Sequence, residues 1–336
     1  FSCAPPISEL LDAIKNNDIA AVKELINQNV SLNSKDESIQ PLELALENKQ
    51  VEIIDILLEA GADTNKPTLD GRSYLNIAYE RKDWELFEKL IKNGADVNIE
   101  VTYYDEKRDR DYTKSLAFWA ARTKNEDYVK LFVENGLDIN YQDEKNGNIL
   151  LHLAVLHLSI DMVKYLVERG SDMNIRNIAT AGNSYYLGTP ARTPLTIAIY
   201  KNFKEKALLL IELGADPSVK SYGDSDIWEE IAYYWEDGYF EICEKIYDTG
   251  FHFDHENFYG LHAACRYHNY EYVKWLLERG ADPNKYSERN NKLPIDLLNT
   301  NPYDIETGEF MEEVAAKANK IQALLLEYGS KPPQQN

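Results

Sequence analysis

One five-residue motif recurs along most of the chain, and most copies hold an aspartate two positions after the opening glycine. The copies are GADTN from Gly61, GADVN from Gly94, GLDIN from Gly136, GSDMN from Gly170, GADPS from Gly214, GFHFD from Gly250 and GADPN from Gly280. These glycines lie 33, 42, 34, 44, 36 and 30 residues apart. Self-similarity at a nearly fixed period predicts serial copies of one small supersecondary unit.

A helical pattern precedes each motif. The segments VEIIDILLEAGAD (51–63), YVKLFVENGLD (128–138), MVKYLVERGSD (162–172) and YVKWLLERGAD (272–282) align without gaps. Their apolar residues recur at i, i+3 and i+4, and the glycine follows the last turn as a left-handed cap. Shorter helical patterns lie upstream, for example QPLELALENK (40–49), ILLHLAVLHL (149–158), TPLTIAIYKN (193–202) and YGLHAACRYH (259–268). Each repeat is therefore predicted to be a short helix, a tight turn, a longer helix and a glycine cap.

The repeat resembles the ankyrin repeat. TPLTIA from Thr193 and ILLHLA from Ile149 are similar to the family motif TPLHxA, and ERGADPN resembles its helix-end signature. The resemblance implies an all-α solenoid of about nine helix-turn-helix repeats joined by β-hairpin-like turns. Residues 225–250 need a one-residue insertion to align, and the last repeat carries the extra sequence NTNPYDIETGEFMEEVAAK.

The domain prediction follows from the repeats. The length of 336 residues is at or beyond the limit of a single globular core. We expect an extended segment over 1–6, one ankyrin-repeat solenoid over 7–330 and a disordered polar tail over 331–336.

The formal net charge of −21 disfavours nucleic acid and anionic membrane as partners. It suits a basic protein partner, although a high charge also simply confers solubility. No apolar run is long enough to span a bilayer. The three cysteines do not form a disulfide framework.

The first residues allow two interpretations. A small residue before Cys3 resembles the cleavage site of a bacterial lipoprotein, but Phe1 fits that pattern poorly. If Cys3 carries a lipid, the chain would be anchored to a membrane in the bacterial periplasm or envelope. If Cys3 is incidental, a cytoplasmic location is expected.

A candidate catalytic or metal cluster lies at His262, Cys265 and His268, spaced by three residues. Alignment of the repeats argues against it, because Cys265 takes an apolar packing position and four convergent metal ligands are not assembled. The resemblance implies that His262, like His152, is a structural hydrogen-bonding residue. The chain also lacks a Walker-type loop, G-x-S-x-G and H-E-x-x-H. We therefore expect no catalytic residue, metal or cofactor; a metal-dependent enzyme using the segment His252–His268 is the alternative.

The resemblance places partner binding on a concave face that is formed by the ends of the first helices and by the hairpin tips. At the helix ends the candidates are Arg81, Arg122, Leu156, His157, Tyr200, Lys201, Arg266 and Tyr267, with Trp235 in the shifted repeat. At the hairpin tips they are Leu69, Asp70, Arg72, Lys145, Asn148, Arg192, His255, Phe258 and Arg289. Two insertions, 100–113 and 176–192, add Tyr103, Tyr104, Tyr185 and Tyr186. Tyrosine and arginine dominate binding hot spots, and loops longer than their connection requires are often functional.

The predicted function is a non-enzymatic module that binds a folded protein partner and is itself a monomer. A narrower hypothesis is a bacterial immunity or inhibitor protein that neutralises a basic toxin or effector, such as a secreted phospholipase. The alternatives are a host-directed ankyrin effector and a general scaffold.

Overall fold

The structure is a computed structural model. It describes residues 5–34, 39–105, 110–143, 146–178, 191–221, 225–233, 235, 239–253, 258–298 and 311–333. The chain divides into two compact units, an N-terminal unit, Phe1–Asp138, and a C-terminal unit, Ile139–Asn336. None of the described helices is both long and apolar enough to span a membrane.

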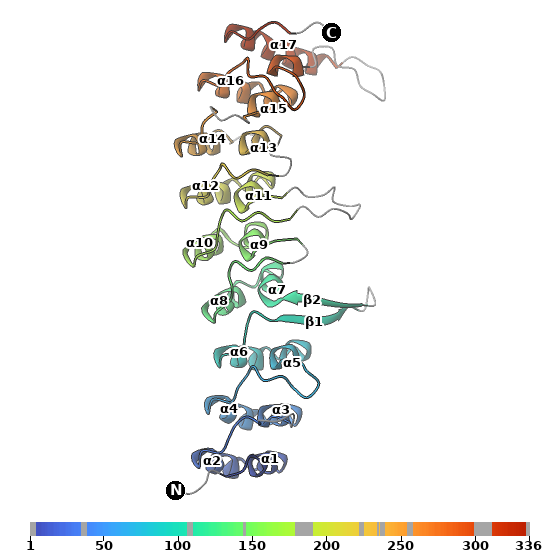
Figure 1. The fold of residues 1–336 in the computed structure, drawn as a ribbon, viewed down its shortest axis with the longest axis vertical. Helices are drawn as coiled ribbons and strands as arrows, with labels where there is room; N and C mark the ends of the chain where they lie inside the picture. Colours follow the sequence, from blue (N-terminus) through green and yellow to red (C-terminus); the bar gives the residue numbers. More distant parts are fainter. Residues whose placement is uncertain are drawn as a thin grey trace. The chain divides into compact units, whose positions relative to one another are not determined.

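Helices in pairs build the N-terminal unit, as the repeat pattern predicts (Figure 1). In order they are α1 (Ile7–Lys15), α2 (Ile19–Asn27), α3 (Pro41–Glu47), α4 (Val51–Glu59), α5 (Tyr74–Arg81), α6 (Trp84–Lys92), α7 (Leu116–Arg122) and α8 (Glu126–Glu134). The first helix of a pair packs on its partner, and α1 also packs on α3, the first helix of the next pair. Each amphipathic helix buries its apolar stripe in this way, which a single repeat could not do.

The first insertion forms a hairpin between α6 and α7. Strand β1 (Glu100–Asp105) pairs antiparallel with β2 (Arg110–Ser115), and Tyr103 lies opposite Tyr112. The hairpin extends away from the helices of its unit (Figure 1). The prediction that residues 100–113 lengthen one turn while leaving the repeat intact is therefore confirmed.

The C-terminal unit repeats the same plan. Its helices are α9 (Leu150–His157), α10 (Ile160–Glu168), α11 (Pro194–Tyr200), α12 (Lys204–Glu212), α13 (Ile227–Tyr233), α14 (Tyr239–Asp248), α15 (Gly260–Arg266), α16 (Tyr270–Glu278), the 3-10 helix η2 (Pro294–Leu297) and α17 (Glu312–Glu327). The first helices α9, α11, α13 and α15 pack on one another in sequence, and η2 packs on α15. The ankyrin-type fold that the sequence predicts is thus observed in both units.

The motif glycines end the second helices. Gly94 has φ 90° and follows α6, where the amide of Ala95 donates to the carbonyl of Leu90 at 3.0 Å. Only glycine adopts this left-handed conformation at little cost, so the motif needs glycine at this position.

The last residue of the motif joins successive repeats. Asn98 donates from Nδ2 to the carbonyl of Gly136 at 3.0 Å, and its Oδ1 accepts from the amide of Asp138 at 2.6 Å. The same asparagine bridge occurs at Asn65, Asn140 and Asn284. GADPS has Ser218 at this position, and within the described residues the Ser218 side chain makes no such bond to the turn at Gly250.

Aromatic side chains fill much of the core. In the N-terminal unit, Phe87 is fully buried, and its ring lies 5.7 Å from Tyr128 and 5.9 Å from Trp84. In the C-terminal unit, Trp228 is fully buried beside Phe253. Aromatic rings bury large areas, so these clusters provide much of the packing energy between repeats.

Candidate functional site

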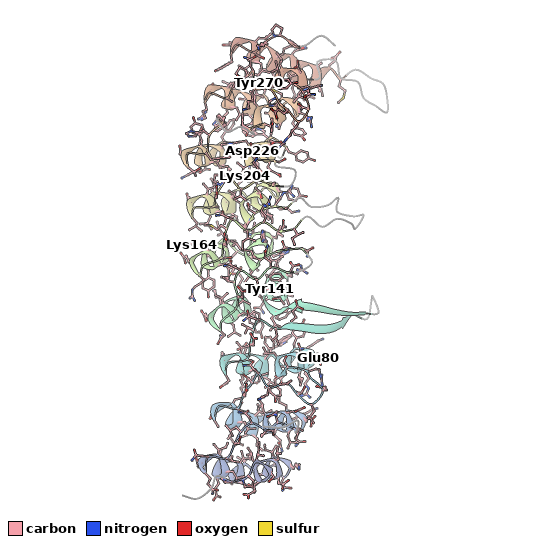
Figure 2. The ribbon with its side chains drawn as sticks, viewed as in Figure 1. Glu80, Tyr141, Lys164, Lys204, Asp226 and Tyr270 are labelled. Atoms are coloured by element: carbon pink, nitrogen blue, oxygen red, sulfur yellow. The ribbon has the colours of Figure 1, made fainter. Side chains whose placement is uncertain are left out.

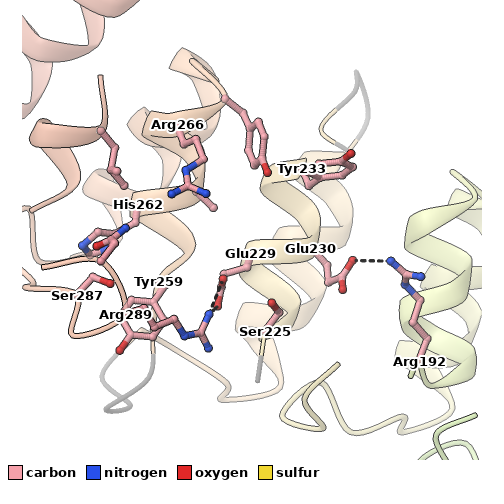
Figure 3. Close-up of a pocket in the computed structure, with 14 residues that line it drawn as sticks. Arg192, Ser225, Glu229, Glu230, Tyr233, Tyr259, His262, Arg266, Ser287 and Arg289 are labelled. Atoms are coloured by element: carbon pink, nitrogen blue, oxygen red, sulfur yellow. Dashed lines mark hydrogen bonds and ion pairs between the residues drawn. The ribbon is translucent and has the colours of Figure 1, made fainter. Parts of the chain in front are cut away.

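A cleft of about 440 Å³ opens in the C-terminal unit between α13, α15 and the turn before η2 (Figure 3). It lies on the row of first helices. Its lining combines arginine, glutamate and tyrosine side chains with His262. The volume falls in the range of ligand-binding pockets, and convergent polar groups of this kind are typical of recognition sites.

Two ion pairs fix the walls of the cleft. Arg289 binds Glu229 at 3.0 Å, and its guanidinium lies 4.5 Å from the centre of the Tyr259 ring. Arg192 binds Glu230 at 3.4 Å, and both residues are buried. These pairs join α13 to the neighbouring repeats on each side, because Arg192 precedes α11 and Arg289 lies in the turn after α16.

Two tyrosines and one arginine line the open side. Tyr233 and Tyr267 are 57% and 41% exposed, and their rings meet edge to face at a centroid distance of 5.1 Å. Arg266 is the last residue of α15, directly before Tyr267, and Figure 3 shows its side chain directed toward the cleft. Among the described carboxylates, none forms an ion pair with Arg266. The arrangement offers aromatic surface and one guanidinium to an incoming group.

A buried carboxyl lies beneath this site. Asp226 directly precedes α13 (Figure 2), is 1% exposed and accepts a hydrogen bond at Oδ1 from the amide of Glu229 at 2.9 Å. Burial and the negative charge of Glu229 raise the pKa of Asp226 to about 8, although Arg289 opposes this shift. The folded chain therefore keeps Asp226 protonated at pH values where the unfolded chain does not.

This pKa shift predicts a loss of stability as the pH rises. Between about pH 4 and about pH 8 the folded chain holds one more proton at Asp226 than the unfolded chain, so the free energy of unfolding falls by up to about 1.4 kcal/mol per pH unit. Asp226→Asn removes this titration and keeps the Oδ1 acceptor. Urea unfolding across this pH range should show a smaller slope for the variant, which becomes the more stable protein near pH 8. If the free energy of unfolding falls with pH equally in both proteins, the raised pKa of Asp226 is contradicted.

The histidines of the motif are structural. His152 accepts at Nδ1 from the amide of Ile149 at 3.0 Å, and its Nε2 bonds to the carbonyl of Arg192 at 3.1 Å. His262 bonds from Nε2 to the carbonyl of Lys292 at 3.2 Å. Burial lowers the pKa of both imidazoles to about 4, so they are neutral at neutral pH. The predicted hydrogen-bonding role is therefore confirmed for both.

The remaining members of the candidate cluster also have structural explanations. Cys265 is fully buried, and burial raises the pKa of its thiol. His268 has φ 55° and follows the end of α15, as Lys82 follows α5. In the part of the chain that the structure describes, no group of three or more His, Cys, Asp or Glu residues could hold a metal ion.

Four predicted residues gather at one place in the N-terminal unit. Leu69, Asp70, Arg72 and Arg81 line a small cleft of about 140 Å³. Leu69 is 61% exposed, whereas Arg72 binds Asp70 at 2.7 Å and Arg81 donates to the carbonyl of Leu46. This hydrogen bond holds Arg81 against α3. Arg122 is exposed at the end of α7.

In the C-terminal unit the predicted residues differ in exposure. His157 and Lys201 are exposed, and Leu156 is half-buried. Tyr200 is half-buried with the guanidinium of Arg192 at 4.2 Å from its ring centre. Trp235 is half-buried and stacks on Tyr272 at 4.6 Å. Arg266 and Tyr267 are the predicted helix-end residues that line the large cleft.

The prediction for Phe258 is wrong. Its side chain is 1% exposed and packs on Phe253 at 5.1 Å, so it belongs to the core rather than to a hairpin surface. Tyr103 and Tyr104 lie in β1. Cys3, Lys145, Tyr185, Tyr186 and His255 lie outside the described residues.

The sequence did not indicate several residues of the cleft. Glu229 and Glu230 look like solvated charges of an acidic chain, yet each has a specific arginine partner 60 or 38 residues away. Nothing in the sequence near Tyr259 indicates that its ring lies under the Arg289 guanidinium. The only local signal was the run of aromatic residues from Tyr233.

Comparison with known proteins supports the repeat assignment. Models of ankyrin repeats match residues 10–101, 75–177 and 248–298. The p105 subunit of nuclear factor NF-kappa-B from Gallus gallus is 30% identical over 202 residues, which cover 59% of this chain and 18% of that protein. Alpha-latrocrustotoxin-Lt1a from Latrodectus tredecimguttatus is 28% identical over 215 residues, covering 59% of this chain and 14% of that protein. The chain thus spans less than a fifth of the length of these two relatives.

A viral relative is closer in length. The ankyrin repeat protein FPV230 of fowlpox virus is 27% identical over 177 residues, covering 52% of this chain and 87% of that protein. Among solved structures, the ankyrin repeat domain of Bcl-3 matches with a TM-score of 0.40 and 22% identity, covering 66% of this chain and 92% of that one. By the extent of the family match, this chain belongs to the ankyrin-repeat family, whose members generally serve as protein–protein interaction modules.

Proposed function

We propose that this chain is a non-catalytic binding module and that the cleft between α13 and α15 contacts its protein partner. The observation that carries the proposal is the exposed pair Tyr233 and Tyr267 beside Arg266, at a cleft of about 440 Å³. Tyrosine and arginine supply large contact area and directional hydrogen bonds, and they are enriched at binding hot spots. The ion pairs behind them hold α13 and α15 in place, which lowers the entropy that binding would cost.

The double variant Tyr233→Ala with Tyr267→Ala tests this proposal. It should stay folded, since both side chains are exposed, and weaken partner binding by more than about 2 kcal/mol, roughly 30-fold. Wild type and variant serve as baits in quantitative affinity purification. For each protein that the wild type captures and the variant does not, calorimetry then measures the affinity for both baits.

Tyr328→Ala is the matched control, because Tyr328 is also 41% exposed but follows α17, away from the cleft residues. Equal affinity of the wild type and the double variant for every captured protein would contradict the placement.

A narrower form of the proposal is an inhibitor or immunity protein that covers a basic toxin or effector, such as a secreted phospholipase. The net charge of −21 supports a basic partner by attracting it over long range. The relatives reported come from animals and viruses, so a bacterial origin and a lipid at Cys3 rest on the sequence alone. Protection of cells that express a candidate toxin, lost with the double variant, would test this form.

A further inference from the structure

We infer that the cleft between α13 and α15 receives a carboxylate side chain from an acidic segment of the partner, and this inference rests on the proposed function. The charge balance of the lining gives the first argument. Its arginines are Arg192, Arg266 and Arg289, and its carboxylates are Glu229 and Glu230. Both carboxylates already hold one arginine each, which leaves Arg266 as the cation without a described ion-pair partner.

The chemistry of Arg266 selects the ligand. A guanidinium presents paired N–H donors that match the two oxygens of a carboxylate, and such charge-assisted pairs are the strong ones. A lysine or arginine of the partner would instead meet Arg266 and Arg289 at close range, and like charges brought together in an interface disfavour that partner. The cleft therefore favours a negatively charged group, whereas the net charge of the whole chain favours a positively charged partner.

The two tyrosines extend the site. Tyr267 follows Arg266 directly, and its ring meets Tyr233 edge to face. Their phenol hydroxyls can donate hydrogen bonds to a carboxylate, and their ring faces can hold the apolar part of a neighbouring side chain. The expected ligand is thus a peptide segment with Asp or Glu next to an apolar or aromatic residue.

A basic partner and a carboxylate in the cleft are compatible. At about 0.15 M salt the field of the whole chain is screened beyond about 8 Å, whereas a contact inside a cleft is screened much less. A partner can therefore carry a net positive charge and still place one acidic segment against Arg266.

Selection from a phage-displayed library of random dodecapeptides tests the inference on the full chain. Peptides enriched by the wild type are expected to contain Asp or Glu, and each is compared with its Asn or Gln isostere by fluorescence anisotropy. Arg266→Gln should weaken binding of the acidic peptide by about 10- to 100-fold. It should weaken binding of the isostere far less, because the two changes remove the same contact.

Arg169→Gln provides the control, since Arg169 is an exposed arginine at the end of α10 in the same unit. It should leave peptide binding unchanged. Enriched peptides without acidic residues, or equal binding to wild type and Arg266→Gln, would overturn the inference. If Tyr233→Ala with Tyr267→Ala then still abolishes binding, the cleft remains a protein-binding site and only the carboxylate assignment fails. If neither variant affects binding, the placement of the site in the cleft fails as well.

Discussion

Replacing Glu230 with alanine is expected to lower the free energy of unfolding of the C-terminal unit by about 3–5 kcal/mol. Glu230 and Arg192 are 8% and 5% exposed, and they pair at 3.4 Å. Removal of the carboxylate leaves a buried guanidinium without its counter-charge, and that cost exceeds the net contribution of the intact pair. Urea unfolding followed by circular dichroism measures the effect.

The double variant Arg192→Met with Glu230→Leu separates the cost of an unpaired charge from the value of the pair. It should recover most of the stability, because apolar residues of similar volume often replace a buried ion pair with little loss. Recovery of stability in the double variant would show that the ion pair mainly specifies how α13 packs on α11. An alanine variant as stable as the wild type would mean that water reaches Arg192.

Phe87→Ala should destabilise the N-terminal unit by about 3–5 kcal/mol. The side chain is fully buried, and its ring lies between Trp84 and Tyr128 in a cluster that joins α6 to α8. Loss of the ring removes its transfer free energy and leaves a cavity that the rigid helices fill poorly. Urea unfolding followed by circular dichroism measures the effect.

Phe87→Leu is the conservative control and should cost less than Phe87→Ala, because leucine keeps an apolar side chain that fills more of the space left by the ring. A large loss with leucine as well would show that ring geometry matters more than volume. An alanine variant that unfolds like the wild type would contradict the burial of this cluster.

Much of the fold could be predicted because its determinants are local. A glycine such as Gly94 ends its helix by its own backbone freedom, and His152 occupies the same position in its repeat as His262 does. Such features recur at a fixed spacing, so alignment of the repeats reveals them. The same alignment identified Cys265 as a packing residue rather than a nucleophile, in agreement with its burial.

The candidate site was only partly predictable. Arg266 and Tyr267 follow from their place in the repeat, but the pairing of Arg289 with Glu229 depends on contacts between residues 60 positions apart. Phe258 shows the opposite error, because whether a hairpin residue is exposed depends on what the next segment covers it with. The position of a residue within a repeat predicts where its backbone lies, whereas tertiary packing decides which residues its side chain contacts.

The interruption of the asparagine bridges at Ser218 has a mechanical consequence. Asn98 holds the next turn with two hydrogen bonds, whereas within the described residues Ser218 makes none of this kind, so stretching the C-terminal unit should first separate the turn at Gly214 from the turn at Gly250. Helix α13, which carries Tyr233, belongs to the repeat on one side of this boundary. At this boundary the connection is left to side chains such as the buried pair of Arg192 and Glu230 and the hydroxyl of Tyr239, which donates to the carbonyl of Ile199 at 2.7 Å.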